Sequence, residues 1–462
     1  MDRTGMPQSS KAQSRPIRRV IGARILASKY DPSKLFDIAI GDRHIVDVSF
    51  HDPKSVPSTL PIDILDARGC LITPSLCHPH VHLDKAFLMS DPKFADLKLE
   101  RGDFAEAMEL GRKAKERFSH EDLTRRGRWL VAESVSSGVT YMRAFAEVDE
   151  SVGFKCLEAA IELKAEFAQY CEIQICLFAQ EPVMSGPRGR QNLELFLKAM
   201  EYPEVEVIGT TPYVEEESFI HTNIKYAINL GKAFKKHVDL HLDYNLDQAQ
   251  APRIGDVIRE IRFSSWRPVD ECVVAGHCTR YSLFSQEQWE NLARSIRNNE
   301  LPISFIGLPT SDLFIQGRPP DASGGGERAR ATLQIPQMIQ QYGLEGAISI
   351  NNVGNAFTPH GSCDPLQLAS WGIGLYQAGT TTDIECLFEC VSSRAKKAIG
   401  IKGSGGIEVG AKADMVIYGS PNGNDRVPLS RQRPRLGLQD LVCDPPNIRD
   451  RRVIFNGCLV EL

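Results

Sequence analysis

Three histidines stand two residues apart in the segment CHPHVHLDK, at positions His78, His80 and His82. On a β-strand the side chains at i, i+2 and i+4 lie on one face, so a single strand would direct three imidazoles to the same side. A buried imidazole needs partners for its polar nitrogens, and neutral imidazole is the commonest metal ligand in proteins. The spacing therefore predicts a divalent metal site on this strand.

Strand-like runs alternate with helix-like segments through the middle of the chain. The strand-like runs are 75–82, 139–146, 173–179, 205–210, 238–243, 272–277, 303–307 and 347–351. Helical sequence lies between them, as at 285–299, where Trp289, Leu292 and Ile296 share one helix face. Eight such units favour a closed (β/α)8 barrel of the TIM type, and an open doubly wound sheet is the alternative.

Both ends of the chain have β character. Residues 19–75 and 410–462 contain short strand-like runs, and together they predict one small β-sandwich domain built from both termini. Residues 76–409 would then form the barrel domain. Residues 1–18 are polar and basic without an apolar stretch, which argues against a secretory signal and predicts a disordered tail, with a mitochondrial presequence as the alternative.

The composition excludes several classes of function. The 462-residue chain has a net charge of −5, which argues against a nucleic-acid-binding surface. No apolar run approaches the roughly 20 residues that a membrane-spanning helix needs. Its 12 cysteines include no C-x-x-C pair and follow no secretory signal, so they indicate reduced thiols. We therefore expect a cytoplasmic protein with no nucleic-acid or membrane partner.

Four histidines fall at the ends of predicted strands. His80 and His82 end the first strand, His241 ends the fifth and His277 ends the sixth. Functional residues of a (β/α)8 barrel lie at the C-terminal ends of its strands. The fold would therefore bring these imidazoles to one rim, which strengthens the prediction of a metal site.

Several segments together resemble a known family. In chain order they are ILDARGCLITPSLCHPHVHLDK (64–85), FAQEPVMSGPRG (178–189), HLD (241–243), GHCT (276–279), IQGR (315–318) and GGIEVGAKADMVIYG (405–419). The set resembles the amidohydrolase superfamily, in its cytosine deaminase-like branch, over about residues 19–420. The resemblance implies a metal-dependent enzyme that hydrolyses carbon–nitrogen bonds other than peptide bonds. Its substrate would be a small molecule, a cyclic amide, amidine or amine, that metal-activated water attacks.

The resemblance also implies roles for individual residues. By position, His80, His82 and His241 would hold one Zn²⁺ or Fe²⁺ that activates water, and His277 would orient or polarise the electrophile. Gln180 would bind the substrate. Phe145 stands where this branch places a polar histidine, which implies a less polar substrate than a pyrimidine. Many members form homo-oligomers, so the resemblance implies an oligomer here as well.

Two positions depart from the family pattern. Asn351 stands where the family places a metal-binding aspartate, and Tyr244 where it places a proton-shuttling glutamate. An asparagine carbonyl can bind a metal but cannot accept a proton from water, and a tyrosine with a pKa near ~10 is a hydrogen-bond donor at neutral pH. We therefore expect Asn351 to be the fourth metal ligand, and His277, Tyr244 and Asp243 to share the proton transfers.

His78 differs from the family as well. It stands where an acidic residue usually precedes the two ligand histidines. We expect it either to support those ligands from behind or to hydrogen-bond to the backbone.

The two lost carboxylates leave three functions open. The first is a hydrolase with altered proton transfer, which the intact histidines favour. The second is a non-hydrolytic cyclase, isomerase or lyase that uses the metal as a Lewis acid and Tyr244 as an acid. The third is a catalytically inactive homologue of the amidohydrolases.

Overall fold

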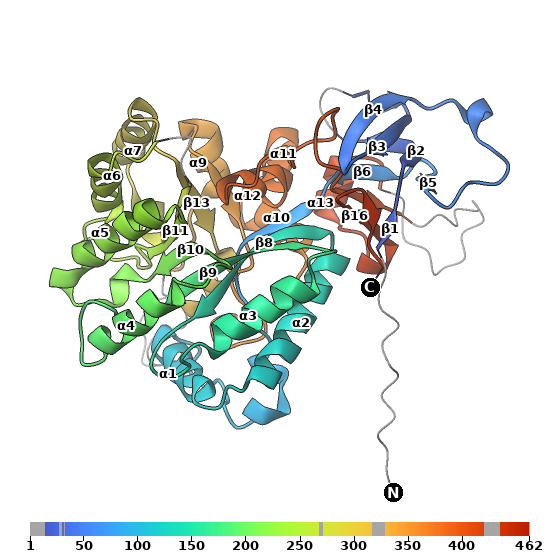
Figure 1. Cartoon of the computed structure of the whole chain (residues 1–462). Helices are drawn as coiled ribbons and strands as arrows, with labels where there is room; N and C mark the ends of the chain where they lie inside the picture. Colours follow the sequence, from blue (N-terminus) through green and yellow to red (C-terminus); the bar gives the residue numbers. More distant parts are fainter. Residues whose placement is uncertain are drawn as a thin grey trace, which may run out of the picture.

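The computed structural model describes residues 14–26, 30–31, 33–267, 271–316, 329–419 and 435–461. Most of the predicted tail, residues 1–13, lies outside these ranges, as do the last two residues of the IQGR segment. The described chain forms a large barrel and a smaller sheet beside it (Figure 1).

Eight parallel strands form the barrel, and each pairs with the next one along the chain. They are β7 (Leu76–His82), β8 (Val139–Glu147), β9 (Glu172–Ala179), β10 (Val205–Thr210), β11 (His237–Leu242), β12 (Val273–His277), β13 (Ile303–Gly307) and β14 (Gly346–Ile348). Each overlaps one predicted strand, so the predicted (β/α)8 barrel is confirmed.

The barrel closes just after β14. The amide of Asn351 donates to the carbonyl of His80 over 3.3 Å, and the amide of His82 donates to the carbonyl of Asn351 over 2.8 Å. The same contact forms a parallel bridge between Val81 and Asn351. The closure therefore places Asn351 directly beside the strand that carries the histidine pair.

Helices cover the outside of the barrel (Figure 1). They are α1 (Phe104–Lys115), α2 (His120–Ser136), α3 (Lys155–Glu166), α4 (Gly189–Ala199), α5 (Glu217–Phe234), α6 (Ile254–Phe263), α7 (Gln286–Asn298), α8 (Pro309–Ile315), α9 (Ile335–Tyr342), α10 (Pro365–Tyr376), α11 (Thr381–Cys390) and α12 (Ser393–Ala398). Helix α7 shows why the sequence folds this way. Ser285 and Gln288 form a capping box at its start, and Trp289, Leu292 and Ile296 are buried on one face.

The second sheet joins the two ends of the chain. Its strands are β1 (Arg15–Pro16), β2 (Arg19–Ile25), β3 (Phe36–Gly41), β4 (His44–Phe50), β5 (Ile64–Asp66), β6 (Leu71–Pro74), β15 (Met415–Tyr418), β16 (Arg451–Phe455) and β17 (Cys458–Leu459). The antiparallel pair of β6 and β15 links the two terminal segments, and the short helix α13 (Leu438–Cys443) precedes β16. Both ends of the chain therefore contribute strands to one curled, mixed sheet, whereas its folding as a separate β-sandwich domain with the predicted bounds stays a prediction.

The sheet begins earlier than the sequence predicts. Arg15 pairs with Leu459, and Pro16 pairs with Cys458. Two residues that we had assigned to the disordered tail thus form an edge strand. A two-residue strand is too short to show the alternation of apolar and polar side chains that identifies a strand in the sequence.

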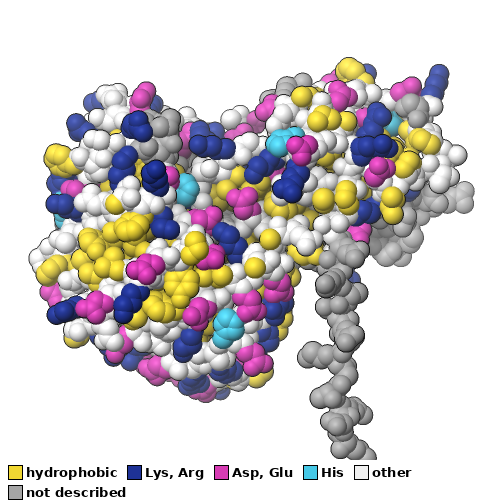
Figure 2. All heavy atoms as spheres, in the orientation of Figure 1, with side chains coloured by type: hydrophobic (Ala, Val, Ile, Leu, Met, Phe, Trp, Pro, Cys, Tyr) yellow, Lys and Arg dark blue, Asp and Glu magenta, His cyan; other side chains and the backbone are white. Residues whose placement is uncertain are grey.

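The surface carries charges of both signs. Figure 2 shows Lys and Arg interspersed with Asp and Glu over the viewed face, with a group of hydrophobic side chains on the barrel. Within the described ranges, no helix is both long and apolar enough to cross a membrane.

A glycine lies at one of the close contacts between the barrel and the second sheet. Gly138 leads from α2 into β8 with a φ of +109°, and a Cβ there would lie 2.8 Å from Cγ2 of Val416 on β15. We expect Gly138→Ala to lower the free energy of unfolding by about 1–3 kcal/mol, because backbone strain and the close contact act together. The urea unfolding midpoint measures this loss.

Gly153→Ala is the control that introduces backbone strain without a close side-chain contact. Gly153 also has a positive φ, +55°, but a Cβ there would meet nothing within 4 Å. A smaller loss than in Gly138→Ala is expected. Equal losses in the two variants would show that the contact with Val416 contributes nothing.

Candidate metal centre

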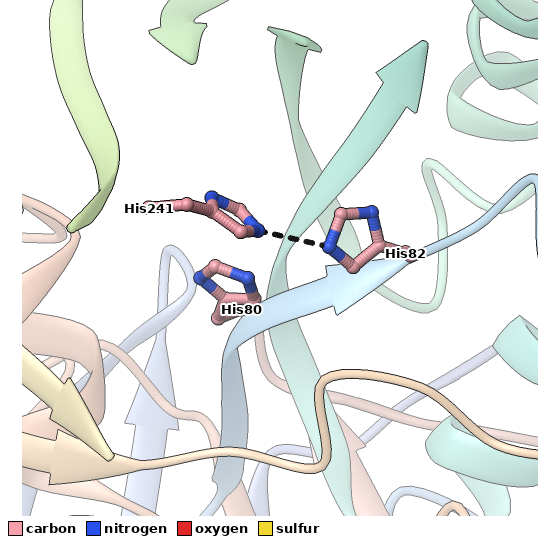
Figure 3. Close-up of side chains that lie close together, drawn as sticks. All are labelled: His80, His82 and His241. Atoms are coloured by element: carbon pink, nitrogen blue, oxygen red, sulfur yellow. Dashed lines mark hydrogen bonds between the residues drawn. The ribbon is translucent and has the colours of Figure 1, made fainter. Parts of the chain in front are cut away.

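Three histidines converge inside the C-terminal end of the barrel. His80 and His82 extend from β7 and His241 extends from β11, and their rings face one another (Figure 3). The Nε2 atoms of His82 and His241 lie 3.1 Å apart, and the ring centroid of His80 lies 4.6 Å from that of His241. All three side chains are buried. Each offers a ligand nitrogen within 4.8 Å of the others, so together they can hold one metal ion.

The chemistry of these nitrogens fits a divalent metal. Both ring nitrogens of His80 and the Nδ1 atoms of His82 and His241 are buried without a hydrogen-bond partner among the described residues. Burial lowers the pKa of all three well below the usual range, so they present lone pairs at neutral pH. Two nitrogens bound to one tetrahedral zinc lie about 3.3 Å apart, close to the separation found here.

A buried ion pair supports His80 from behind. Oδ1 of Asp239, on β11, lies 3.8 Å from Nδ1 of His80, and Oδ2 accepts a hydrogen bond of 2.7 Å from Arg143 on β8. Burial raises the pKa of Asp239 to about 6, although Arg143 opposes the shift. A carboxylate facing the second nitrogen of a ligand histidine fixes the orientation of the ring. Asp239 escaped the sequence analysis, although it shares a strand face with His241.

Asn351 lies beside the histidines with its carbonyl oxygen unused. Its Nδ2 donates to Oγ of Ser311 over 2.7 Å, whereas its Oδ1 is buried and has no partner in the described part of the chain. Its φ of +58° is one that asparagine tolerates better than most residues. This orientation is compatible with the predicted role of Asn351 as a fourth ligand through Oδ1.

His78 does not join the three histidines. Its Nε2 donates to the carbonyl of Cys363 over 3.1 Å, which is the second of the two contacts expected for it. The register of β7 against β8 shifts between His78 and Val81, and this irregularity interrupts the shared face that regular alternation predicts.

Phe145, a predicted substrate contact, packs among the ligand rings. Its ring centroid lies 4.1 Å from that of His80 and 4.9 Å from that of His82, and its side chain is fully buried. It also packs edge to face against Phe178 at 5.2 Å. The ring therefore supports the metal centre from within the barrel, and its contact with a substrate stays a prediction.

Tyr244 and His277 form a stacked pair at the opening of the site. Their ring centroids lie 4.0 Å apart, and the ring of His277 lies 5.1 Å from that of His241. Tyr244 lines a cavity of about 510 Å³ at the barrel mouth, together with Phe104 and Tyr213. Burial raises the pKa of Tyr244 well above its usual value, so its hydroxyl stays protonated and can donate a hydrogen bond.

A carboxylate that the sequence analysis missed holds His277. Oδ1 of Asp312, on α8, lies 2.7 Å from Nδ1 of His277, and Oδ2 accepts a hydrogen bond of 2.8 Å from Thr332. Asp312 is fully buried. Burial raises its pKa, and the hydrogen bond from His277 opposes that shift. The Asp312 carboxylate accepts a hydrogen bond from Nδ1 of His277. The other ring nitrogen of His277, Nε2, is therefore the one that can exchange a proton.

Asp243, expected to share the proton transfers, is engaged elsewhere. Its carboxylate accepts from the hydroxyl of Tyr281 over 2.6 Å and from the backbone amide of Arg253 over 2.9 and 3.0 Å. Its backbone has a φ of +50°. These bonds tie the loop after β11 to α6 and to the segment after β12. These bonds fit a positioning role for Asp243, and its expected share in the proton transfers stays a prediction.

Gln180 lies at the end of β9 and is held by a lysine. Its Oε1 accepts a hydrogen bond of 3.1 Å from Nζ of Lys85, which directs its amide group. Lys85 and Lys115 both form ion pairs with Glu147 at the end of β8. Glu147 also lies near His82 and Asp84 in a second group of potential metal ligands. Because two ammonium groups neutralise Glu147, this second group needs no metal ion.

The chain is similar to known proteins both in sequence and in fold. No protein-family model matches the chain. The chain is 23% identical over 361 residues to the N-isopropylammelide isopropyl amidohydrolase of Pseudomonas sp. (strain ADP). The aligned region covers 78% of this chain and 82% of that protein.

Two solved structures share the fold. A 5-methylcytosine deaminase from Klebsiella pneumoniae matches with a TM-score of 0.77 and 20% identity over 96% of this chain and 98% of that one. An adenosine deaminase from Xanthomonas campestris with bound zinc matches with a TM-score of 0.62 and 15% identity, over 97% and 94% of the two chains. Both structures confirm the fold that the sequence resemblance implies.

The ion pair behind His80 generates a prediction. Asp239→Asn keeps the shape of the side chain but removes the negative charge that faces Nδ1 of His80. We expect affinity for Zn²⁺ to fall about 10–100-fold, as for other residues that orient metal ligands. Competition with a chromophoric chelator measures the change.

Asp364→Asn is the matched control. It also loses a buried ion pair, here the bond of 2.6 Å to Arg451 on β16, but away from the three ligand histidines. Stability should fall in this variant without a change in zinc affinity. An equal fall in affinity in both variants would contradict a specific role for Asp239.

Proposed function

We propose that this chain, related in sequence and fold to the cytosine deaminase-like amidohydrolases, is a metal-dependent hydrolase. It cleaves a carbon–nitrogen bond in a cyclic amide, amidine or amine of a small molecule. One observation carries the proposal: three buried imidazoles, with the Nε2 atoms of His82 and His241 only 3.1 Å apart, converge beside the hydrogen-bonded pair of His277 and Asp312. The relatives support hydrolysis over the alternatives, because they are named as an amidohydrolase and as deaminases.

The metal would be a single Zn²⁺ or Fe²⁺ held by His80, His82, His241 and Oδ1 of Asn351. Such an ion supplies Lewis acidity that makes water a stronger nucleophile at neutral pH. Three neutral histidines and a neutral amide leave the full positive charge of the ion uncompensated by its ligands, which favours that activation. The zinc of the adenosine deaminase from Xanthomonas campestris supports zinc among the candidates.

His277 would move the proton that hydrolysis requires. Water adds its oxygen to the substrate carbon, and the proton released from water must reach the departing nitrogen. Nε2 of His277 accepts the proton and then delivers it, while Asp312 stabilises the charged imidazole through Nδ1. In this proposal the pair of His277 and Asp312 takes over the proton transfer that carboxylates would perform at the positions of Tyr244 and Asn351.

Tyr244 and Gln180 would bind the substrate from two sides. The Tyr244 hydroxyl remains a donor, and the ring lines the mouth cavity. Because Oε1 of Gln180 is occupied by Lys85, its Nε2 is the group left to donate to the substrate. Both contacts suit a substrate that presents hydrogen-bond acceptors such as carbonyl oxygens.

We further propose a cytoplasmic location and a homo-oligomer. All 12 cysteines are free thiols, and most are buried, which supports a reducing compartment. The oligomer rests on the resemblance to the family.

Oxygen labelling tests the proposed reaction. The zinc-loaded or iron-loaded chain would be incubated with N-isopropylammelide, pyrimidines, cyclic amides and ureides in water enriched in oxygen-18. A hydrolase transfers one labelled oxygen to the product, whereas a cyclase, isomerase or lyase transfers none. Product without label would support a non-hydrolytic enzyme, and a metal-loaded chain that converts nothing in this panel would support the inactive homologue.

Two isosteric substitutions test which carboxylate serves proton transfer. Asp312→Asn should lower kcat by about 10²–10⁴-fold with little change in KM, because it removes the group that orients and stabilises the His277 imidazole. Asp243→Asn should instead lower stability more than kcat, because it loosens the loop after β11. Steady-state kinetics and urea unfolding measure both. The reverse pattern would return the proton transfer to Asp243.

A further inference from the structure

An apolar hollow lies beside the metal centre. It is enclosed by α1, the segment after β7 and the loop that follows β14, and its volume of about 30 Å³ has room for about two water molecules. The apolar side chains that line it include Leu88, Phe94, Leu97, Ala107, Leu110 and Phe357. Water gains few hydrogen bonds in such a space, so the hollow favours an apolar occupant.

The inner wall of the hollow is continuous with the substrate side of the metal centre. Lys85 lines the hollow and lies three residues after His82, and its Nζ donates to Oε1 of Gln180. Asn355 lines it as well and donates both to the carbonyl of Lys85 and to Oδ1 of Asn352. A group in the hollow would therefore lie next to the residues that hold Gln180 and next to the loop that begins at Asn351.

The outer side of the hollow lies next to the mouth cavity, because a residue lining the one packs against a residue lining the other. Phe357, which lines the hollow, packs against Phe104 with ring centroids 6.2 Å apart. Phe104 in turn lines the mouth cavity and lies 5.9 Å from the ring of Tyr244. The contact between these two phenylalanines thus forms part of the wall between the mouth cavity and the hollow.

We infer that the hollow binds a short alkyl group of the substrate, of about one to three carbons. The inference rests on the proposed function and narrows its substrate class to a small amide, amidine or amine that carries such a substituent. The polar part of the substrate faces Gln180, Tyr244 and the metal centre, and the alkyl group enters beside Phe104 and Phe357. Each methylene that moves from water into the hollow strengthens binding about fourfold.

Gly111 offers a way to fill the hollow without disturbing the fold. It lies within α1 and lines the hollow, and a Cβ there would approach Cε2 of Phe357 to 3.7 Å, an ordinary contact. Alanine is also the better helix former, so Gly111→Ala should fold at least as well as the natural chain. The matched control is Gly374→Ala in α10, where a Cβ would meet nothing within 4 Å.

The experiment compares ammelides that carry an N-methyl, N-ethyl or N-isopropyl group, on the zinc-loaded chain. The readout is kcat/KM where turnover occurs and 1/Kd by calorimetry where it does not. We expect the natural chain and Gly374→Ala to prefer isopropyl over methyl by about 15-fold, because two more carbons are buried. In Gly111→Ala the preference should shrink to about fourfold or less.

Xenon provides a readout that needs no activity. Under xenon pressure, crystals of the natural chain should show an atom in the hollow, and crystals of Gly111→Ala should show little or none. An empty hollow, no alkyl preference in the natural chain, or the same preference in Gly111→Ala would each overturn the inference. Alkyl-dependent binding that Gly111→Ala removes, without any hydrolysis, would uphold the hollow and contradict the proposed function alone.

Discussion

Three buried imidazoles that face one another are the constraint on which the rest of the site depends. His80, His82 and His241 bring ligand nitrogens within 4.8 Å of one another in the interior of a closed barrel. Among the described residues, Nε2 of His80 has no hydrogen-bond partner, and an unpartnered buried polar group destabilises the folded chain by about 1–3 kcal/mol. Neutral lone pairs gathered at one buried place suit a divalent cation. The barrel supplies this arrangement because strands distant in sequence end at one rim.

Two buried carboxylates divide the work around this site. Asp239 lies behind His80 and is balanced by Arg143, so it acts on the ligand side. Asp312 lies behind His277 and is balanced by that imidazole and by Thr332, so it acts on the proton-transfer side. The family that the sequence resembles places its catalytic carboxylates at the positions of Asn351 and Tyr244. In the proposed reaction the negative charge of Asp312 lies one residue farther from the reacting atoms, and His277 connects it to them.

The sequence predicted the barrel and the three histidines because both depend on local pattern. The eight strands are buried runs of suitable length, and the histidines stand at strand ends where a barrel must bring them together. Asp239 was also accessible to this reasoning, since it precedes His241 by two residues on the same strand. Its burial as an ion pair was not predictable in the same way. The partner that balances its charge, Arg143, lies on another strand, far away in the sequence.

Other features were beyond sequence reasoning for physical reasons. Asp312 lies in a helix, 35 residues after His277, and no spacing rule connects a helix position to a strand end. His78 leaves the shared face because the strand register shifts beside it, which depends on pairing with β8. The bonds that Asp243 makes to Tyr281 and Arg253 join parts of the chain far apart in sequence, so the sequence could not show them.

The central claim is that His80, His82 and His241 bind a catalytic metal together. X-ray absorption at the zinc edge of the zinc-loaded chain tests it most directly. The account predicts three imidazole nitrogens at about 2.0–2.1 Å, with any remaining ligands being oxygen. A sulfur ligand at about 2.3 Å, or fewer than three imidazoles, would contradict the account, because the metal would then lie at a cysteine site or outside the barrel.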